Sequence, residues 1–154
     1  MKLMVLDGNS ILNRAFYGVR PLNTKDGTPT NAVYGFLNIL LKLLEDEKPE
    51  GLCVAFDLKA PTFRHKMYDG YKAQRKPMPE ELAIQMPIIK DVLSAMNIPR
   101  IELEGYEADD IIGTLSKMVD EEGEFIATIV SSDKDLLQLI SDEVTVKLLK
   151  QTGH

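Results

Sequence analysis

Hydrophobic residues in this chain fall into two patterns, short continuous runs and stripes spaced by three and four. The stripes predict amphipathic helices over residues 31–46, 80–96 and 107–123. Pro87 should kink the second of these or mark where its regular part begins, and Gly123 should stop the third. The continuous runs predict strands at residues 3–7, 51–57, 98–103, 125–130 and 143–149, with a helical segment after the first strand and a short helix over 133–140.

Alternating strands and helices predict an α/β fold, a mostly parallel central sheet with helices on both faces. A chain of 154 residues with 44% hydrophobic content is enough for one such domain with a proper core. Residues 58–79 are the exception, because they show no apolar period and contain three prolines. We expect this stretch to be a long, partly helical insertion over one face of the domain.

Acidic residues follow four of the predicted strands. Asp7 comes at the end of the first strand, and Asp57 closes the second. Functional sites in parallel sheets lie outside the carboxyl ends of the strands, so we expect these side chains to share one edge. The acids after the other two strands are Glu107, Asp109 and Asp110, followed later by Asp133 and Asp135.

Taken singly, most of these acids have a structural explanation. Asp133 suits the N-cap of a helix, the acids within 107–110 suit a first helical turn, and Asp7 suits a turn. Asp57 is harder to explain in this way, because no predicted helix begins directly after it. Taken together, seven carboxylates with Lys134 as the one nearby base in these motifs would repel strongly unless cations bind among them.

Carboxylate ligands favour Mg²⁺ or Mn²⁺, and the two isolated histidines, His65 and His154, offer no zinc site. Two such cations suit the hydrolysis of a phosphodiester bond, for which the protein need supply no nucleophile. The sequence shows no P-loop, no G-x-S-x-G motif and no obvious Ser-His-Asp set.

Two other functions stay open at this point. A phosphatase working through a phospho-aspartate would use a D-x-D-G-T motif, which "LDGNS" fits poorly because Val5 stands where the first aspartate is needed. A non-catalytic module that binds DNA or a partner protein is the second alternative. Cleavage of DNA with Mn²⁺ would separate all three.

Charge is distributed unevenly along the chain. The net charge is −6, but residues 1–100 hold 14 basic and 11 acidic residues, whereas residues 101–154 hold 4 and 13. Residues 59–76 contain six basic residues against one acid. A basic segment beside an acid-rich remainder is what a site for both cations and a polyanion would need.

Several residues are candidates for contact with nucleic acid. Lys72, Arg75 and Lys76 suit contacts with phosphates, and Tyr71 suits stacking on a base. A solvated loop explains the same segment without any partner. Arg14 also has two explanations: it could hold a phosphate, or it could pair with an acid.

Composition also bears on the compartment. The single Cys53 lies in an apolar run and is expected to be a buried, inert thiol. One cysteine allows no disulfide framework, so a reducing compartment, the cytoplasm, is expected. Asp7 interrupts the early apolar run, so no signal peptide is expected, and no stretch approaches the ~20 apolar residues of a membrane span.

Five successive motifs resemble those of the 5′→3′ exonuclease domain of bacterial DNA polymerase I, a member of the flap endonuclease family of structure-specific 5′ nucleases. They are "LDGNSILNRAF", "NAVYGFLN", "VAFDLKAPTFRHKMYDGYKAQRKPMP", "GYEADDIIGTL" and "SSDKDLLQL", in the family's order. The resemblance implies a three-layer PIN-like core over residues 1–154 with a basic, arch-like insertion at about 59–79. It implies a 5′→3′ exonuclease or 5′-flap endonuclease that uses metal ions, with roles in RNA primer removal and DNA repair.

The resemblance also assigns metal ligands. Four acids match the ligands of the family's first metal, a fifth is adjacent to them, and two more match ligands of the second metal. In that order they are Asp7, Asp57, Glu107 and Asp109, then Asp110, then Asp133 and Asp135. The implied cofactor is Mg²⁺ or Mn²⁺ at a two-metal site.

Other matches concern the DNA. Tyr71, Lys72 and Arg75 match gateway or arch residues that contact the strand near the scissile phosphate. Lys72 and Arg75 therefore join Asp7 and Asp57 as catalytic candidates. Arg14 matches a basic residue near the catalytic centre, and Lys76 completes the DNA-binding set with it.

One departure concerns the family's downstream residues. The family carries further aspartates of the second metal site in a "GDxxDN"-like segment and then a helix–loop–helix that grips the duplex, whereas this sequence ends at His154. We therefore expect an incomplete second site and weak duplex binding. The implied partners are DNA with 5′ ends, flaps or nicks, or an RNA–DNA hybrid, with no membrane and with a polymerase domain on the same parent chain.

Overall fold

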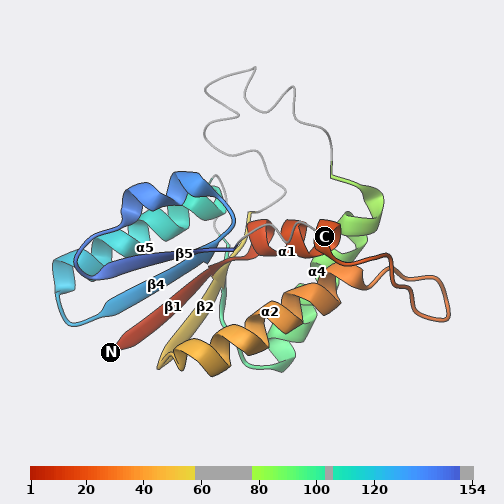
Figure 1. The fold of residues 1–154 in the computed structure, drawn as a ribbon, viewed down its shortest axis with the longest axis horizontal. Coiled ribbons are helices and arrows are strands. Elements are labelled where there is room, and N and C mark those ends of the chain that lie inside the picture. Colours follow the sequence, from red (N-terminus) through yellow and green to blue (C-terminus); the bar gives the residue numbers. More distant parts are fainter. Residues whose placement is uncertain (58–77, 103–105, 150–154) are drawn as a thin grey trace, which may run out of the picture.

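Helices and strands alternate through the chain, and the computed structural model describes them over residues 1–57, 78–102 and 106–149. The described elements are β1 (Lys2–Asp7), α1 (Gly8–Gly18), α2 (Asn31–Glu47), β2 (Gly51–Ala55), α4 (Glu80–Ala95), β3 (Arg100–Ile101), α5 (Ala108–Glu122), β4 (Ile126–Ser131), η1 (Lys134–Leu139) and β5 (Val144–Leu148). The element η1 is a short 3₁₀-helix. Figure 1 shows β1, β2 and β4 fanning out beneath α5, with α1, α2 and α4 grouped beside them.

All five described strands pair in parallel, in the order β3-β2-β1-β4-β5. β1 lies at the centre, where Leu3 pairs with Gly51 and Asp7 pairs with Ala55 of β2. Because these strands run in the same direction, their carboxyl ends lie at one edge of the sheet. The predicted parallel α/β sheet is confirmed for this part of the chain.

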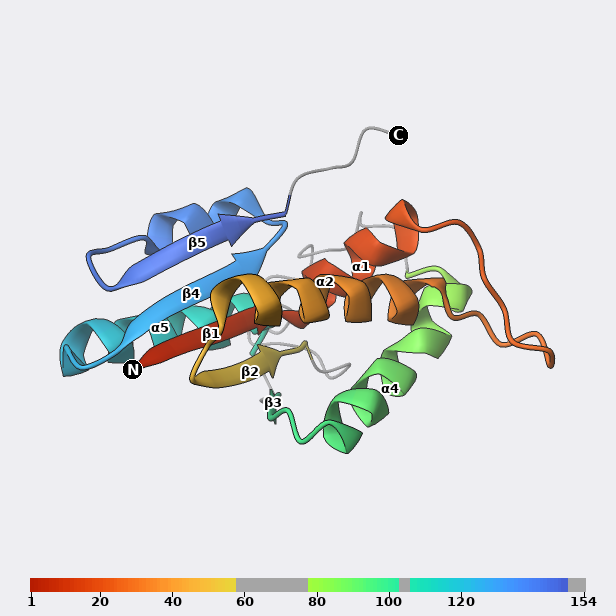
Figure 2. The ribbon, with the colours of Figure 1, turned by 60° about the horizontal axis from the view of Figure 1, so that its bottom comes forward.

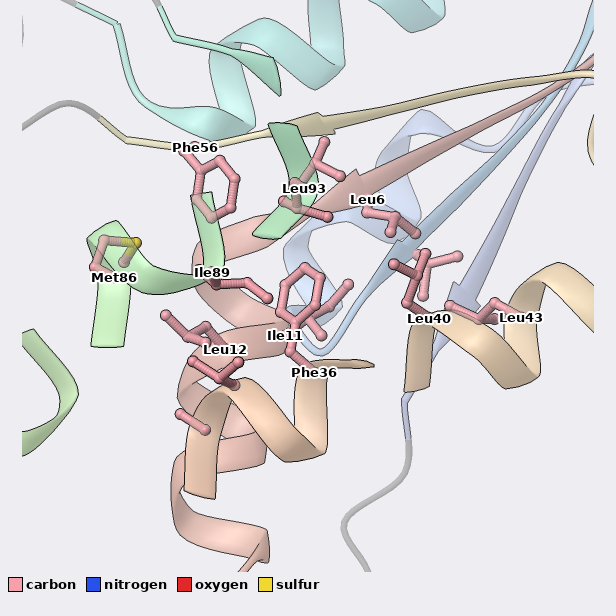
Figure 3. Close-up of a cluster of buried hydrophobic side chains, with 14 of the residues drawn as sticks. Leu6, Ile11, Leu12, Phe36, Leu40, Leu43, Phe56, Met86, Ile89 and Leu93 are labelled. Atoms are coloured by element: carbon pink, nitrogen blue, oxygen red, sulfur yellow. The ribbon is translucent and has the colours of Figure 1, made fainter. Parts of the chain in front are cut away.

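Helices cover both faces of the sheet, as Figure 2 shows. Side chains alternate along β1, so Leu6 joins one apolar cluster with α1, α2 and α4, whereas Val5 joins another with α5 and η1. In the first cluster, Phe36 and Ile89 are fully buried with Leu6 (Figure 3). The strand that carries Asp7 is therefore packed from both sides.

Two buried amide side chains join the three helices on the first face. The Gln85 Oε1 atom accepts hydrogen bonds from the backbone N–H groups of Ala32 (2.7 Å) and Val33 (3.0 Å), in the first turn of α2. Gln85 Nε2 donates to Asn31 Oδ1 (2.8 Å), and Asn31 Nδ2 donates to the carbonyl of Phe16 in α1 (2.9 Å). These bonds satisfy backbone groups that the helix ends leave without partners, and they fix α4 against the junction of α1 and α2.

The structure differs from the sequence predictions at three places. β3 pairs over two residues instead of residues 98–103, because it meets only the last part of β2. α4 begins at Glu80 and continues through Pro87, so the idea that its regular part begins at Pro87 is wrong; burial of one face outweighs the lost N–H. Cys53 is half-buried, although burial still raises the pKa of its thiol to about 11, as suits an inert side chain.

Most of the predicted insertion, residues 58–77, lies outside the described residues. Residues 78 and 79 lead directly into α4. Among the described helices, none combines the length and the apolar composition that crossing a membrane requires.

Two helical glycines predict opposite effects of added volume. A Cβ at Gly35 would meet the Ala15 Cβ at 2.8 Å, where α1 and α2 pack closely, whereas a Cβ at Gly113 would meet no atom within 4 Å. We expect Gly35→Ala to lower the free energy of unfolding by about 1–3 kcal/mol. Gly113→Ala, the matched control, should raise it by up to ~1 kcal/mol through helix propensity. Urea denaturation measures both, and equal effects would contradict the close helix packing.

Candidate metal centre

The seven predicted acids all lie at the carboxyl edge of the sheet, and six of them lie at the beginnings of helices. Asp7 ends β1 and caps α1, and Asp57 lies two residues after β2. Glu107 is the N-cap of α5, Asp109 and Asp110 lie in its first turn, Asp133 is the N-cap of η1, and Asp135 lies in its first turn. The predicted strand-end placement is therefore found in the structure.

Asp7 is the most buried of these acids, with 3% of its surface exposed. Its Oδ2 accepts a hydrogen bond from the Ser131 hydroxyl (2.8 Å), and its Oδ1 accepts a longer one from the Ser10 N–H (3.3 Å). Burial raises the pKa of Asp7 to about 7, against the lowering effect of the Ser131 bond. The negative charges of Asp109 and Asp57 raise it further.

Asp57 connects the end of β2 to the start of α5. Its N–H donates to Asn9 Oδ1 (2.8 Å), and its Oδ1 accepts a short hydrogen bond from the N–H of Ala108. The sequence suggested no helix for Asp57 to cap, because the helix that it caps begins about 50 residues later. Its carboxylate therefore has a structural role as well as a place among the other acids.

The acids of α5 form a close group. The Asp110 side chain accepts a hydrogen bond from the Glu107 N–H (3.0 Å), which together with the Glu107 side chain makes a capping box. Burial raises the pKa of Asp109 to about 6, and the charges of Asp133, Asp57, Glu107 and Asp110 add to the rise. Acids from three different connections are therefore within electrostatic reach of Asp109.

The last motif brings Asp133 and Asp135 to the same edge. Asp133 Oδ1 accepts from the Asp135 N–H (2.9 Å), which is the capping role that the sequence allowed. Asp135 lines a cleft of about 620 Å³ together with the acids of α5, and Lys117 and Gln138 lie in the same cleft.

A divalent cation fits this donor set by its chemistry. The donors are carboxylate oxygens, which Mg²⁺ and Mn²⁺ prefer. A cation would offset the mutual repulsion that adds to the effect of burial on the pKa of Asp109. As they stand, no three acidic, histidine or cysteine side chains of the described residues are grouped closely enough to hold one ion. Several of the carboxylates are turned toward protein donors instead, so binding would require some of these side chains to rotate.

The structure describes one of the predicted DNA-contacting residues. Arg14 lies in α1 and is half-exposed, and none of the ion pairs between described residues involves it. Within the described part of the chain, its guanidinium is therefore available for an anion. Tyr71, Lys72, Arg75 and Lys76 lie outside the described residues and stay predictions.

Sequence reasoning missed the polar residues behind the acids. Asn9 holds the backbone of Asp57, and Ser131 holds the carboxylate of Asp7. Ser10 accepts from the Ser132 N–H (2.7 Å), which joins the start of α1 to the loop after β4. Their position two or three residues from an acid in "DGNS" and "SSD" was the available signal.

Comparison with known proteins identifies relatives along almost the whole chain. Residues 2–153 match the family model described as "5′-3′ exonuclease, N-terminal resolvase-like domain". The chain is 50% identical over 149 residues to the DNA polymerase I of Caldicellulosiruptor bescii, covering 97% of this chain and 17% of that protein. It is 48% identical over 144 residues to the 5′-3′ exonuclease of Aquifex aeolicus, covering 94% of this chain and 50% of the relative. The chain thus spans half or less of the length of these relatives.

Solved structures of bacteriophage T5 proteins share the fold. The T5 5′-exonuclease with bound divalent metal ions (zinc) superposes with a TM-score of 0.71 at 21% identity, over 97% of this chain and 55% of that one. The T5 flap endonuclease in a complex with DNA and metal ions gives a TM-score of 0.65 at 21% identity, with the same coverage. These likenesses confirm the predicted fold.

The raised pKa of Asp7 predicts how stability depends on pH without metal. Between its unfolded value of 3.8 and its folded value of about 7, the folded protein holds a proton that the unfolded chain has released. The free energy of unfolding should therefore fall as the pH rises from about 4 to 7, by a few kcal/mol from this group. Asp7→Asn should remove the part of this fall that comes from Asp7, keep the smaller part that comes from the raised pKa of Asp109, and be more stable than the parent at pH 8.

Urea denaturation in EDTA at several pH values measures this dependence. Asp46→Asn is the matched control, because Asp46 is exposed near the end of α2, at the opposite edge of the sheet. If the free energies of unfolding of the parent and of Asp7→Asn differ by the same amount at every pH, the pKa of Asp7 is not raised by folding.

Proposed function

We propose, because the chain belongs to the family of 5′-3′ exonuclease N-terminal, resolvase-like domains, that residues 1–154 form the PIN-like catalytic core of a metal-dependent 5′ nuclease. The reaction is hydrolysis of phosphodiester bonds in DNA. The proposed substrates are DNA with 5′ ends, flaps or nicks, and RNA–DNA hybrids. RNA primer removal and DNA repair are the proposed roles, with a polymerase domain on the parent chain.

The observation that carries this proposal is the gathering of seven carboxylates from four separate connections at one sheet edge. Folding places Asp7 and Asp109 where burial and neighbouring charge raise their pKa values, which costs stability in the absence of cations. A cation-binding site explains why a protein would keep such a cluster. The relatives named as exonucleases and the metal-bound T5 structures support the same function.

The resemblance to the 5′ nuclease family divides the acids into two sets. The first set would hold one Mg²⁺ or Mn²⁺ ion and consists of Asp7, Asp57, Glu107, Asp109 and Asp110. Asp133 and Asp135 would hold a second ion less completely. Bound cations of this kind activate water and stabilise charge on the phosphate and on the leaving oxygen.

The chain's own groups prepare the site. Asn9 and Ala108 hold Asp57 from its two sides, so its position is set by β2, α1 and α5 together. Arg14, with its guanidinium available, would bind a phosphate of the strand. Tyr71 would stack on a base, and Lys72, Arg75 and Lys76 in the basic segment would contact phosphates near the scissile bond.

Cleavage of a labelled 5′-flap DNA tests the proposal. We expect weak cleavage with millimolar Mn²⁺, better than with Mg²⁺, because Mg²⁺ gives up its waters reluctantly at a site with few ligands. Asp57→Asn should lower the rate by more than about 100-fold, and Asp46→Asn should leave it unchanged. Release of inorganic phosphate from small esters would indicate a phosphatase instead. DNA binding without cleavage at any metal concentration would indicate a non-catalytic module.

The two sets of acids predict unequal metal sites. The resemblance assigns four carboxylates and an adjacent fifth to the first ion and two carboxylates to the second, and affinity for a hard cation falls as anionic ligands are removed. Calorimetry with Mn²⁺ should therefore show one ion bound at least about 10-fold more tightly than a second. Two equally tight ions would show that the division into a strong and a weak set is wrong.

A further inference from the structure

A single buried hydroxyl links the two sets of acids. Ser131, the last residue of β4, is fully buried. Its Oγ donates to Asp7 Oδ2 (2.8 Å) and accepts from the Asp133 N–H (2.9 Å). The hydroxyl therefore donates its proton to an acid of the first set and accepts a hydrogen bond from the backbone of an acid of the second set.

The sheet explains why this residue can reach both. β1 and β4 are neighbours, with Leu6 paired to Val130, so the next residues, Asp7 and Ser131, come to lie side by side at the carboxyl edge. The chain then turns from Ser131 into the N-cap of η1. The Ser131 hydroxyl therefore lies between Asp7, at the end of β1, and Asp133, the first acid of the second set.

Further hydroxyls hold this link in place. Ser10 Oγ lies 2.6 Å from Ser132 Oγ and 3.3 Å from Ser131 Oγ. It also accepts the Ser132 N–H, so the start of α1 and the end of β4 are bonded to each other. Rotation of the Ser131 side chain is thereby restricted.

We propose that Ser131 is a positioning residue for metal binding, which fixes the Asp7 carboxylate by its Oδ2 and sets the Asp133 segment at a defined place beside it. This inference rests on the proposed function. Among the described residues, the other oxygen, Asp7 Oδ1, has only the long bond of 3.3 Å to the Ser10 N–H, so it is the oxygen that Asp7 can give to a cation. Partners of a ligand that orient it in this way contribute strongly to metal affinity.

Three substitutions at Ser131 test the role of its hydroxyl. Ser131→Ala removes the hydroxyl, Ser131→Cys keeps the size with a weak donor, and Ser131→Thr keeps the hydroxyl. The first two should weaken binding of the tighter Mn²⁺ ion by about 10-fold or more, and Ser131→Thr should restore it. Ser116→Ala is the matched control, because Ser116 is also buried and its hydroxyl, among the described residues, bonds only within α5, to the carbonyl of Ile112.

Mn²⁺ affinity is measured by calorimetry on the whole chain, and the melting temperature in EDTA is measured for every variant. The proposal holds if affinity falls with loss of the hydroxyl, returns in Ser131→Thr and is unchanged in Ser116→Ala. It is overturned if Ser131→Ala and Ser131→Cys bind Mn²⁺ as the parent does, or if affinity follows the melting temperature alone. A parent chain that binds no Mn²⁺ overturns the proposed function itself, and this inference with it.

Discussion

Repulsion between carboxylates at the carboxyl edge of the sheet is the constraint around which this protein is organised. A sheet whose described strands all run the same way collects everything that follows those strands at one edge. Here that edge receives acids from four connections. Burial first, and the neighbouring negative charges in addition, raise the pKa values of Asp7 and Asp109, which shows the cost of holding them there. The remainder of the fold must hold like charges together that would otherwise separate.

The packing around β1 meets this demand. β1 is the central strand, with apolar clusters on both faces, so Asp7 cannot move away without disturbing the core. The amide pair Asn31 and Gln85 fixes α1, α2 and α4 to one another, which holds α1 firmly at the site. The free energy of hydrophobic burial therefore opposes the electrostatic repulsion, as expected where a functional site is strained.

The sequence alone was sufficient for the architecture and for the location of the acids. Hydrophobic period identifies the helices that carry Phe36, Ile89 and Ile112, because each buries one face against the sheet. The predicted boundaries of strands were less accurate where a strand depends on pairing with its neighbour. β3 is an example, because it pairs only with the last two residues of β2. The role of Ser131 could not be read from sequence, because its partner Asp7 is 124 residues away and only the fold brings them together.

The structural and functional explanations of the acids prove to be compatible. Asp7, Glu107 and Asp133 do cap helices, and Asp57 caps α5 from a distant strand. A backbone N–H at a helix start stabilises a carboxylate as a cation would, although more weakly. Capping therefore compensates part of the repulsion while no metal is bound, and it leaves oxygens that can turn toward a cation. An acid placed at a helix start is thus suited to both states, which explains why the acids of this edge coincide with the beginnings of its helices.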